Sequence, residues 1–114
     1  MNRVTLIGKL LDTPRVRNFE TRNGPIETVS LWIEIQDNGR SDRFSVEITC
    51  PKQGAAAKAF AKDVIVEVHG KLRHDRWKDA ATKRWTGKVY VAIDPAEGTV
   101  RSKGMAHTPE AEAA

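Results

Sequence analysis

Cations and tryptophans are concentrated in one short stretch of the chain, residues 71–88. This stretch holds seven Lys or Arg residues and two Asp residues, a net charge of +5, whereas the whole chain carries +4. It also contains Trp77 and Trp85. Ammonium and guanidinium groups neutralise phosphates, and flat indole rings stack on unpaired bases. These residue types therefore favour a ribbon that binds single-stranded nucleic acid.

A structural interpretation of the same stretch is equally simple. Charged hairpins are common on protein surfaces, and tryptophans also pair across two strands to stabilise a sheet. Residues 71–88 alone do not separate the two interpretations. The choice between them depends on the strands that position residues 71–88.

Composition limits the class of protein. A chain of 114 residues is the size of one domain, and a pI near 9.5 favours polyanionic partners. Cys50 is the only cysteine, which excludes an intrachain disulfide and favours a reducing compartment. The three histidines lack the spacing of metal ligands, so we expect neither a metal nor another cofactor.

Membrane and enzyme classes are not favoured by the sequence. The chain shows no apolar signal segment and no run of about 18 apolar residues, so we expect a cytoplasmic protein without membrane contact. Asp75 and Asp79 lie among cations and are expected to be their ion-pair partners. With no phosphate-binding lysine loop or activated nucleophile in view, we expect no catalytic residues.

Alternation of apolar and polar residues predicts strands, and Asn-Gly pairs predict the turns between them. The expected strands cover residues 3–10 with a continuation after a bend to 19, then 26–37, 44–50, 64–77 and 84–93. Alanine-rich residues 53–62 predict a short helix. This order is that of an all-β, five-stranded OB-fold Greek-key barrel with a helix between the third and fourth strands. We expect the domain to span residues 1–94 and a flexible tail to span 95–114.

The same alternation assigns side chains to the two faces of each strand. Trp32 is expected to point away from the core, and Lys71, Arg73 and Trp77 to share the solvent-facing side of residues 64–77. Leu72 and Val89 are expected to point inward. Trp85 also falls on a core-facing position, unless it lies beyond the barrel rim or a bulge shifts it.

Four blocks, in order along the chain, resemble the bacterial single-stranded DNA-binding protein family. They are residues 1–10, 14–17, 68–77 and 84–91. The resemblance implies an OB-fold that forms homo-oligomers, either tetramers or dimers, and wraps single-stranded DNA without sequence preference. The family also carries an acidic C-terminal tip that recruits replication and repair proteins. Here Glu110 and Glu112 are only a weak counterpart, so the chain resembles a short form that lacks this tip.

The resemblance also assigns roles to single residues. It makes Trp77 a base-stacking ring and Arg3 a basic residue of the first strand. Phe44 matches an aromatic that opens the third strand, although its alternation with buried positions fits a core residue equally well. Cys50 stands where a second stacking aromatic is expected, and Trp32 is a candidate substitute for a further missing tryptophan.

The expected function is therefore sequence-independent single-stranded DNA binding in replication, recombination or repair, with a nucleoid-associated location. The expected binding residues are Arg3, Trp32, Phe44, Lys71, Arg73, Arg76, Trp77, Lys78, Lys83, Arg84 and Trp85. The alternative is an OB-fold adaptor, similar to primosomal replication protein N, that acts mainly through protein partners. DNA and RNA both remain open as ligands.

Overall fold

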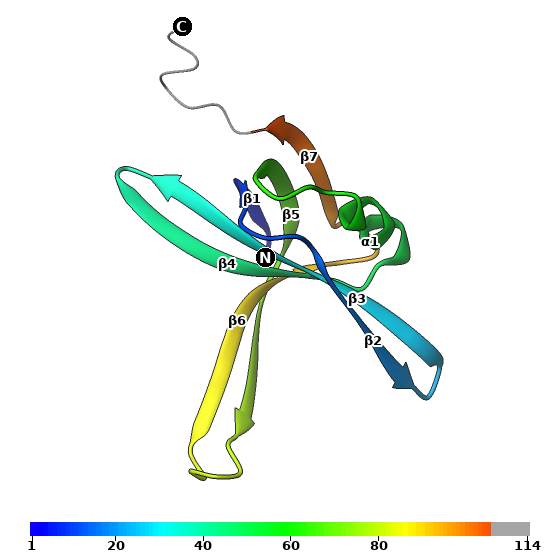
Figure 1. Cartoon of the computed structure of the whole chain (residues 1–114). Coiled ribbons are helices and arrows are strands. Elements are labelled where there is room, and N and C mark those ends of the chain that lie inside the picture. The colour runs from blue at the N-terminus through cyan, green and yellow to red at the C-terminus, as the bar shows by residue number, and fades with distance from the viewer. Residues whose placement is uncertain (106–114) are drawn as a thin grey trace, which may run out of the picture.

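The computed structural model describes residues 1–105 of the chain, so Glu110 and Glu112 lie outside the described residues. The elements follow one another as β1 (Val4–Leu10), β2 (Arg15–Thr21), β3 (Gly24–Asp37), β4 (Arg40–Ile48), α1 (Pro51–Lys58), β5 (Val64–Lys78), β6 (Trp85–Ile93) and β7 (Thr99–Met105). Figure 1 shows their arrangement. None of the helices within residues 1–105 has the length and apolarity needed to cross a membrane.

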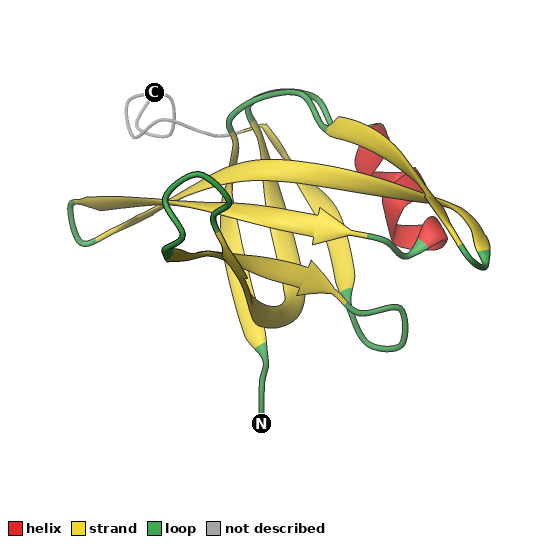
Figure 2. Cartoon of the chain, turned by 90° about the horizontal axis from the view of Figure 1, so that it is seen from below, coloured by secondary structure: helices red, strands yellow, loops and turns green. Residues whose placement is uncertain are grey.

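Five of the strands close into a barrel. β1 pairs with β5 along most of its length and with β3 at Lys9 and Leu10, which closes the ring β1–β3–β4–β6–β5. All of these pairings are antiparallel except β4 with β6. β2 follows a bend after β1 and pairs with β3. The predicted OB-fold is confirmed, with α1 between the third and fourth barrel strands and packed at one side of the barrel (Figure 2).

Alternating residues of the barrel strands form the core, as the sequence predicts. Its buried hydrophobic residues are Leu10, Val29, Leu31, Ile33, Val46, Ile48, Ala57, Val64, Val66, Val68, Val91, Ile93 and Val100. Because side chains of a strand point alternately to its two faces, the intervening residues lie on the outside of the barrel. The core therefore fixes which side chains are available to a ligand.

Gly70 marks the point where β5 changes partners. Up to residue 70, β5 pairs with β1, and from Lys71 onward it pairs with β6. A Cβ atom at Gly70 would lie 2.5 Å from the carbonyl oxygen of Ala92 on β6. Glycine at this position thus permits the close approach of the two strands at the bend of the barrel.

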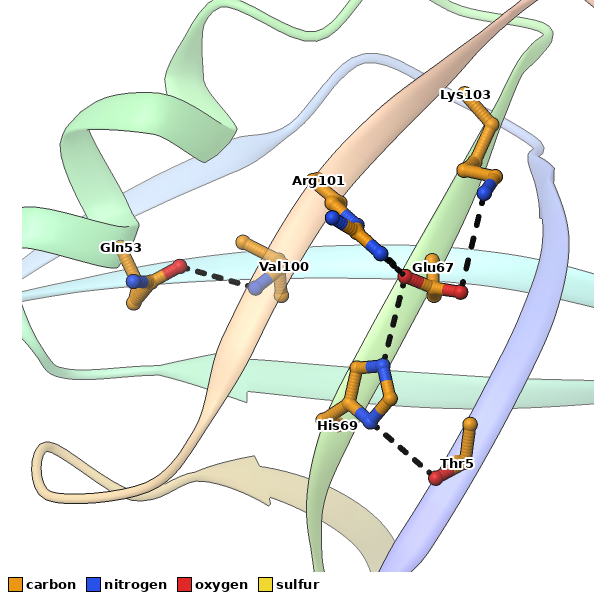
Figure 3. Close-up of polar contacts among 7 residues, drawn as sticks. All are labelled: Thr5, Gln53, Glu67, His69, Val100, Arg101 and Lys103. Carbon is orange, nitrogen blue, oxygen red and sulfur yellow. Dashed lines mark hydrogen bonds and ion pairs between the residues drawn. The ribbon is translucent and has the colours of Figure 1, made fainter.

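β7 corrects the expected domain boundary, because residues 99–105 form a strand beyond residue 94 instead of a flexible tail. β7 pairs with the first half of β5, and its Val100 is buried in the core. Figure 3 shows how polar contacts hold it: Arg101 donates to Glu67 of β5 at 2.7 Å, and the amide of Val100 donates to Gln53 of α1 at 3.0 Å. The period-two pattern of β7 is too short and too polar to stand out in the sequence.

Two further expectations need correction. The helix is shorter than predicted and shifted toward the N-terminus, because Pro51 occupies a first-turn position that suits its fixed φ angle. Leu72 and Val89 are 45% and 51% exposed rather than inward. Both lie where β5 and β6 extend past the barrel, so their inward-facing positions have no core to cover.

Three long hairpins project from the barrel, formed by β2–β3, β3–β4 and β5–β6 (Figure 1). β4 pairs with β6 only from Val91 to Ile93, so the rest of β6 pairs with β5 alone among the described residues. We call the two-stranded part of β5–β6, residues 72–91, the ribbon. It contains most of the basic stretch that the sequence singles out.

Candidate nucleic-acid interface

The outer face of β3 and β4 presents a tryptophan. Trp32 lies opposite Ser45 and is 44% exposed, as predicted from its alternation. Ser30, on the same face, lies opposite Glu47. These side chains point away from the core, because Leu31 on β3 and its partner Val46 on β4, which lie between them along the strands, are buried.

The outer face of the ribbon presents a second tryptophan. Trp77 lies opposite Thr86 and is 48% exposed, and Arg73 lies opposite Tyr90 on the same face. Opposed residues of an antiparallel pair share a face, so one side of the ribbon carries both rings and the guanidinium group. The prediction that Arg73 and Trp77 share a solvent-exposed side is confirmed.

β2 extends this surface in the other direction. Its Arg15 and Arg17 lie opposite Ser30 and Thr28, on the same face of β3 as Trp32. Phe19 follows on that face and is 51% exposed. Cations and rings thus continue along the β2–β3 hairpin beyond the barrel.

These side chains form one continuous surface, which we call the binding face. It consists of Arg15, Arg17, Phe19, Ser30, Trp32, Ser45, Glu47, Arg73, Asp75, Trp77, Lys88 and Tyr90. The junction between β4 and β6 is bridged by Lys88, whose Nζ lies 3.3 Å from Oε1 of Glu47. A groove of about 550 Å³ crosses the middle of the face, and Arg15, Arg17 and Trp32 are among its lining residues.

Glu47 is one of two carboxylates that line this groove, together with Asp12. It accepts hydrogen bonds from the hydroxyls of Ser30 and Ser45 as well as from Lys88. These contacts hold Lys88 in the groove, but the negative charge opposes a phosphate. Arg15, Arg17 and Arg73 have no carboxylate within 4 Å among residues 1–105, so they are the available cations of the face.

Tyr90 is the most enclosed ring of the face. Its burial, together with a hydrogen bond to Asp75, raises the pKa of the phenol, so the ring stays neutral. The ammonium group of Lys88 lies 5.8 Å from the ring centre. Asp75 has no lysine or arginine within 4 Å among residues 1–105, since Lys88 opposite it pairs with Glu47, so the expectation that Asp75 is an ion-pair partner is wrong.

Arg3 directly precedes β1, and Lys71 lies midway along β5. They line a second groove of about 390 Å³, together with Asp94. The Nζ of Lys71 lies 2.7 Å from the carboxylate of Asp94, and its hydrogen bond lowers the pKa of that carboxyl group. Lys71 is therefore partly neutralised within the protein, whereas Arg3 has no such partner among the described residues.

Lys83 and Arg84 lie in the loop at the tip of the ribbon. Asp79 shapes this loop by accepting hydrogen bonds from the amides of Ala81 and Thr82 at 2.8 and 2.9 Å. Those bonds lower the pKa of its carboxyl group, Thr82 contributing most. The expectation that Asp79 is an ion-pair partner is wrong, because its carboxylate organises the turn.

Three predicted residues lie on the opposite side of the ribbon from Trp77. Trp85 lies opposite Lys78, and Arg76 is opposite Gly87. Trp85 is 66% exposed because it lies beyond the barrel rim, which explains its core-facing position in the sequence pattern. The structure therefore does not bring Arg76, Lys78 and Trp85 together with Trp77 on one face.

Phe44 is on the core side of β4. It lies opposite the buried Ile33 and packs, half-buried, against the core cluster. A stacking role for Phe44 is not compatible with this placement, and the core interpretation is correct. Cys50 precedes α1 at its N-cap position and lies away from the binding face.

Sequence reasoning did not select Arg15, Arg17, Phe19, Lys88 or Tyr90 as binding residues. A signal was present: Arg15, Arg17 and Phe19 alternate with Val16 and Asn18, which places all three on one face. The alternation does not show that β2 pairs with β3, and it is this pairing that places the three side chains on the same face as Trp32.

The closed barrel, with its helix between the third and fourth barrel strands, defines the chain as an OB-fold protein. No family model matches it. In sequence it is 28% identical over 82 residues to the single-stranded DNA-binding protein of Thermosynechococcus vestitus, an overlap of 72% of this chain and 68% of that protein. The resemblance predicted from the four sequence blocks is thereby confirmed.

Solved structures show the same fold. A Plasmodium falciparum SSB in complex with ssDNA superposes with a TM-score of 0.69 at 16% identity, covering 90% of this chain and 94% of that one. The mitochondrial single-stranded DNA-binding protein Rim1 of S. cerevisiae gives a TM-score of 0.67 at 8% identity, covering 91% and 96%. At these identities the two superpositions establish the fold alone.

Proposed function

We propose that this protein binds single-stranded DNA without sequence preference. The observation that carries the proposal is the binding face, on which exposed Trp32 and Trp77 lie with arginines that have no carboxylate partner within 4 Å among the described residues. The names of the relatives, single-stranded DNA-binding proteins, support the same ligand. An RNA strand presents the same kinds of phosphate and base, and the names of the relatives are what favours DNA over RNA as the ligand.

The mechanism follows from the two kinds of side chain. Arg15, Arg17 and Arg73 displace counterions from phosphates, which supplies affinity that depends on salt and not on sequence. Trp32 and Trp77 stack on unpaired bases, and every base offers a π-face to such a ring. A duplex keeps its bases stacked on one another, so it uses only the cations of the face.

We further propose that the protein works as a homo-oligomer, a dimer or tetramer. On β1, the residues from Val4 to Ile7 pair with β5 on one edge and have no strand partner on the other edge among residues 1–105. Ile7 is 51% exposed on this strand. An unpaired edge with an exposed apolar side chain is suited to pairing with a second copy.

The proposed setting is replication, recombination or repair of DNA, in the cytoplasm and with the nucleoid. Binding and protection of the strand need no catalytic group, and the relatives are named for binding. Recruitment of replication or repair proteins stays part of the proposal. The adaptor alternative is not favoured, since the exposed tryptophans and cations suit nucleic acid directly.

The proposal is tested by fluorescence anisotropy with a labelled oligothymidylate of roughly 16 nucleotides, the upper site size of one OB-fold. A duplex of equal length is the control. If Arg15, Arg17 and Arg73 each neutralise one phosphate, the log–log salt slope is roughly −2.1 and affinity falls about 20-fold between about 50 and 200 mM salt. Equal affinity for strand and duplex, or no binding, contradicts the proposal.

A further inference from the structure

The ribbon has a second exposed face that the proposed function does not use. Past Leu72 and Val91 no third strand pairs with β5 or β6 among the described residues, so solvent reaches both faces and both edges. Among residues 1–105, the side chain of Asn2 makes two hydrogen bonds of 2.9 Å to the backbone of Leu72 at one edge, and Lys88 is bridged to Glu47 on the outer side. Beyond these contacts at the base of the ribbon, no third strand lies between its two faces among the described residues.

The reverse face carries the most exposed tryptophan of the described residues. Trp85 is 66% exposed, against 48% for Trp77 and 44% for Trp32. It lies opposite Lys78, and Arg76 and His74 follow on the same face. An indole ring that packs so little of its surface against the protein contributes little to the stability of a two-stranded ribbon.

Charge on the reverse face has one sign. Its positions are residues 72, 74, 76, 78, 85, 87 and 89, and none of them is Asp or Glu. Arg76 and Lys78 have no carboxylate within 4 Å among residues 1–105, whereas Lys71 and Lys88 of the outer side pair with Asp94 and Glu47. The reverse face is thus the less neutralised side of the ribbon and complements a polyanion.

The cation and the ring of the reverse face are already close together. The guanidinium carbon of Arg76 lies 5.7 Å from the ring centre of Trp85. Gly87, opposite Arg76, is covered by the imidazole of His74, because a Cβ atom there would lie 2.5 Å from Nε2 of His74. A nucleotide presents a phosphate and a base at a comparable separation, so one nucleotide suits both groups at once.

We propose that single-stranded nucleic acid occupying the binding face continues around the ribbon onto this reverse face, where Trp85 stacks on a base and Arg76 and Lys78 contact phosphates. The inference rests on the proposed function and adds to it a second set of contacts on the same strand. Its consequence is a dependence on length. Short strands fill the binding face alone, and longer strands gain the additional contacts.

The test compares Trp85→Ala with wild-type protein on two labelled oligothymidylates, of roughly 6 and roughly 25 nucleotides. Loss of one stacked base lowers affinity for the long strand about 5- to 150-fold. Affinity for the short strand stays unchanged. Trp85→Phe keeps a ring and restores most of the long-strand affinity.

A second variant, which removes charge and keeps Trp85, distinguishes loss of nucleic-acid contacts from local unfolding of the ribbon. Arg76→Ala with Lys78→Ala reduces the magnitude of the salt slope by roughly 1.4 on the long strand, for two phosphates, and leaves the short strand unaffected. Lys52→Ala, an exposed cation on α1, is the matched control and changes neither strand. Circular dichroism checks that each variant is folded.

The outcomes separate this inference from the proposed function. If wild-type protein binds neither strand, the proposed function fails. If wild-type protein binds both and Trp85→Ala binds the long strand equally well, the reverse face does not contact nucleic acid and the inference is wrong. A loss equal on both lengths also overturns it, since Trp85 then belongs to the primary site. Binding of a poly-glutamate peptide that Trp85→Ala abolishes, without any effect on the long strand, assigns the face to an acidic protein partner instead.

Discussion

Removal of the Trp77 indole is expected to weaken single-stranded DNA binding without unfolding the protein. Trp77 is 48% exposed on the outer face of the ribbon, where it lies opposite Thr86 and shares its face with Arg73. In Trp77→Ala the cations of the binding face remain, but the ring that stacks on a base is lost. The electrostatic part of binding therefore survives, and the stacking part of this position does not.

The magnitude follows from the exposed ring. One base–aromatic stack contributes about 1–3 kcal/mol, so affinity falls about 5- to 150-fold, and we expect at least tenfold for a ring this accessible. The cost to folding is smaller, because a cross-strand pair contributes about 0.2–1 kcal/mol in a protein stabilised by about 5–15 kcal/mol. Binding and stability thus respond to the substitution by clearly different amounts.

The assay is an anisotropy titration of a labelled oligothymidylate with both proteins at one salt concentration. Trp77→Phe is expected to lose less affinity than Trp77→Ala, since it keeps a smaller ring. Val16→Ala is the matched control, because Val16 is 43% exposed on the side of β2 away from the binding face. Affinity of Trp77→Ala equal to that of wild-type protein, with folding intact, refutes the stacking role.

Three further perturbations address the charges of the protein. Arg15→Ala with Arg17→Ala is expected to make the log–log salt slope less negative by roughly 1.4, and an unchanged slope excludes both residues from phosphate contact. Glu47→Gln removes the carboxylate that pairs with Lys88, so oligothymidylate affinity rises several-fold at low salt; a fall in affinity means that Glu47 organises the groove more than it repels the strand. The pKa of Glu67 is lowered, mainly by the hydrogen bond from Arg101 of β7. The ionised form of Glu67 therefore stabilises the fold above about pH 4.3. This contribution is lost as the pH falls through the lower pKa of the folded state. Urea unfolding of Glu67→Gln is therefore expected to show a stability deficit at pH 7 that shrinks toward pH 3, and a deficit independent of pH contradicts this role.

The fold was largely predictable because the barrel strands follow a strict period of two. Leu31 and Ile33 are buried while Trp32 is exposed, as the alternation requires. Asn38 and Gly39 form the turn of the β3–β4 hairpin, both with positive φ, which explains why this dipeptide predicts a turn. The points at which β5 and β6 leave the barrel were not predictable from the sequence. The alternation of β5 and β6 continues past the rim, so Leu72 is exposed at a position where the pattern indicates core.

The binding site was predictable only in part, since the pattern of one strand does not show which strands lie beside it. Trp77 and Arg73 were found because they lie on the same strand. Trp85 was grouped with them by proximity in sequence, although its strand partner Lys78 places it on the reverse face. Arg15 reaches the binding face through the pairing of β2 with β3, a long-range feature that no local pattern encodes.

The central claim, that single-stranded DNA lies across the outer face of the barrel and ribbon, is tested most directly by the indole N–H resonances of the three tryptophans. An NMR titration with an oligothymidylate of roughly 6 nucleotides reports on each ring separately, once single substitutions have assigned the signals. The resonances of Trp32 and Trp77 are expected to shift together and to saturate at one strand per binding face, while that of Trp85 stays in place. A titration in which Trp85 shifts alone, or in which none of the three resonances moves, contradicts the account.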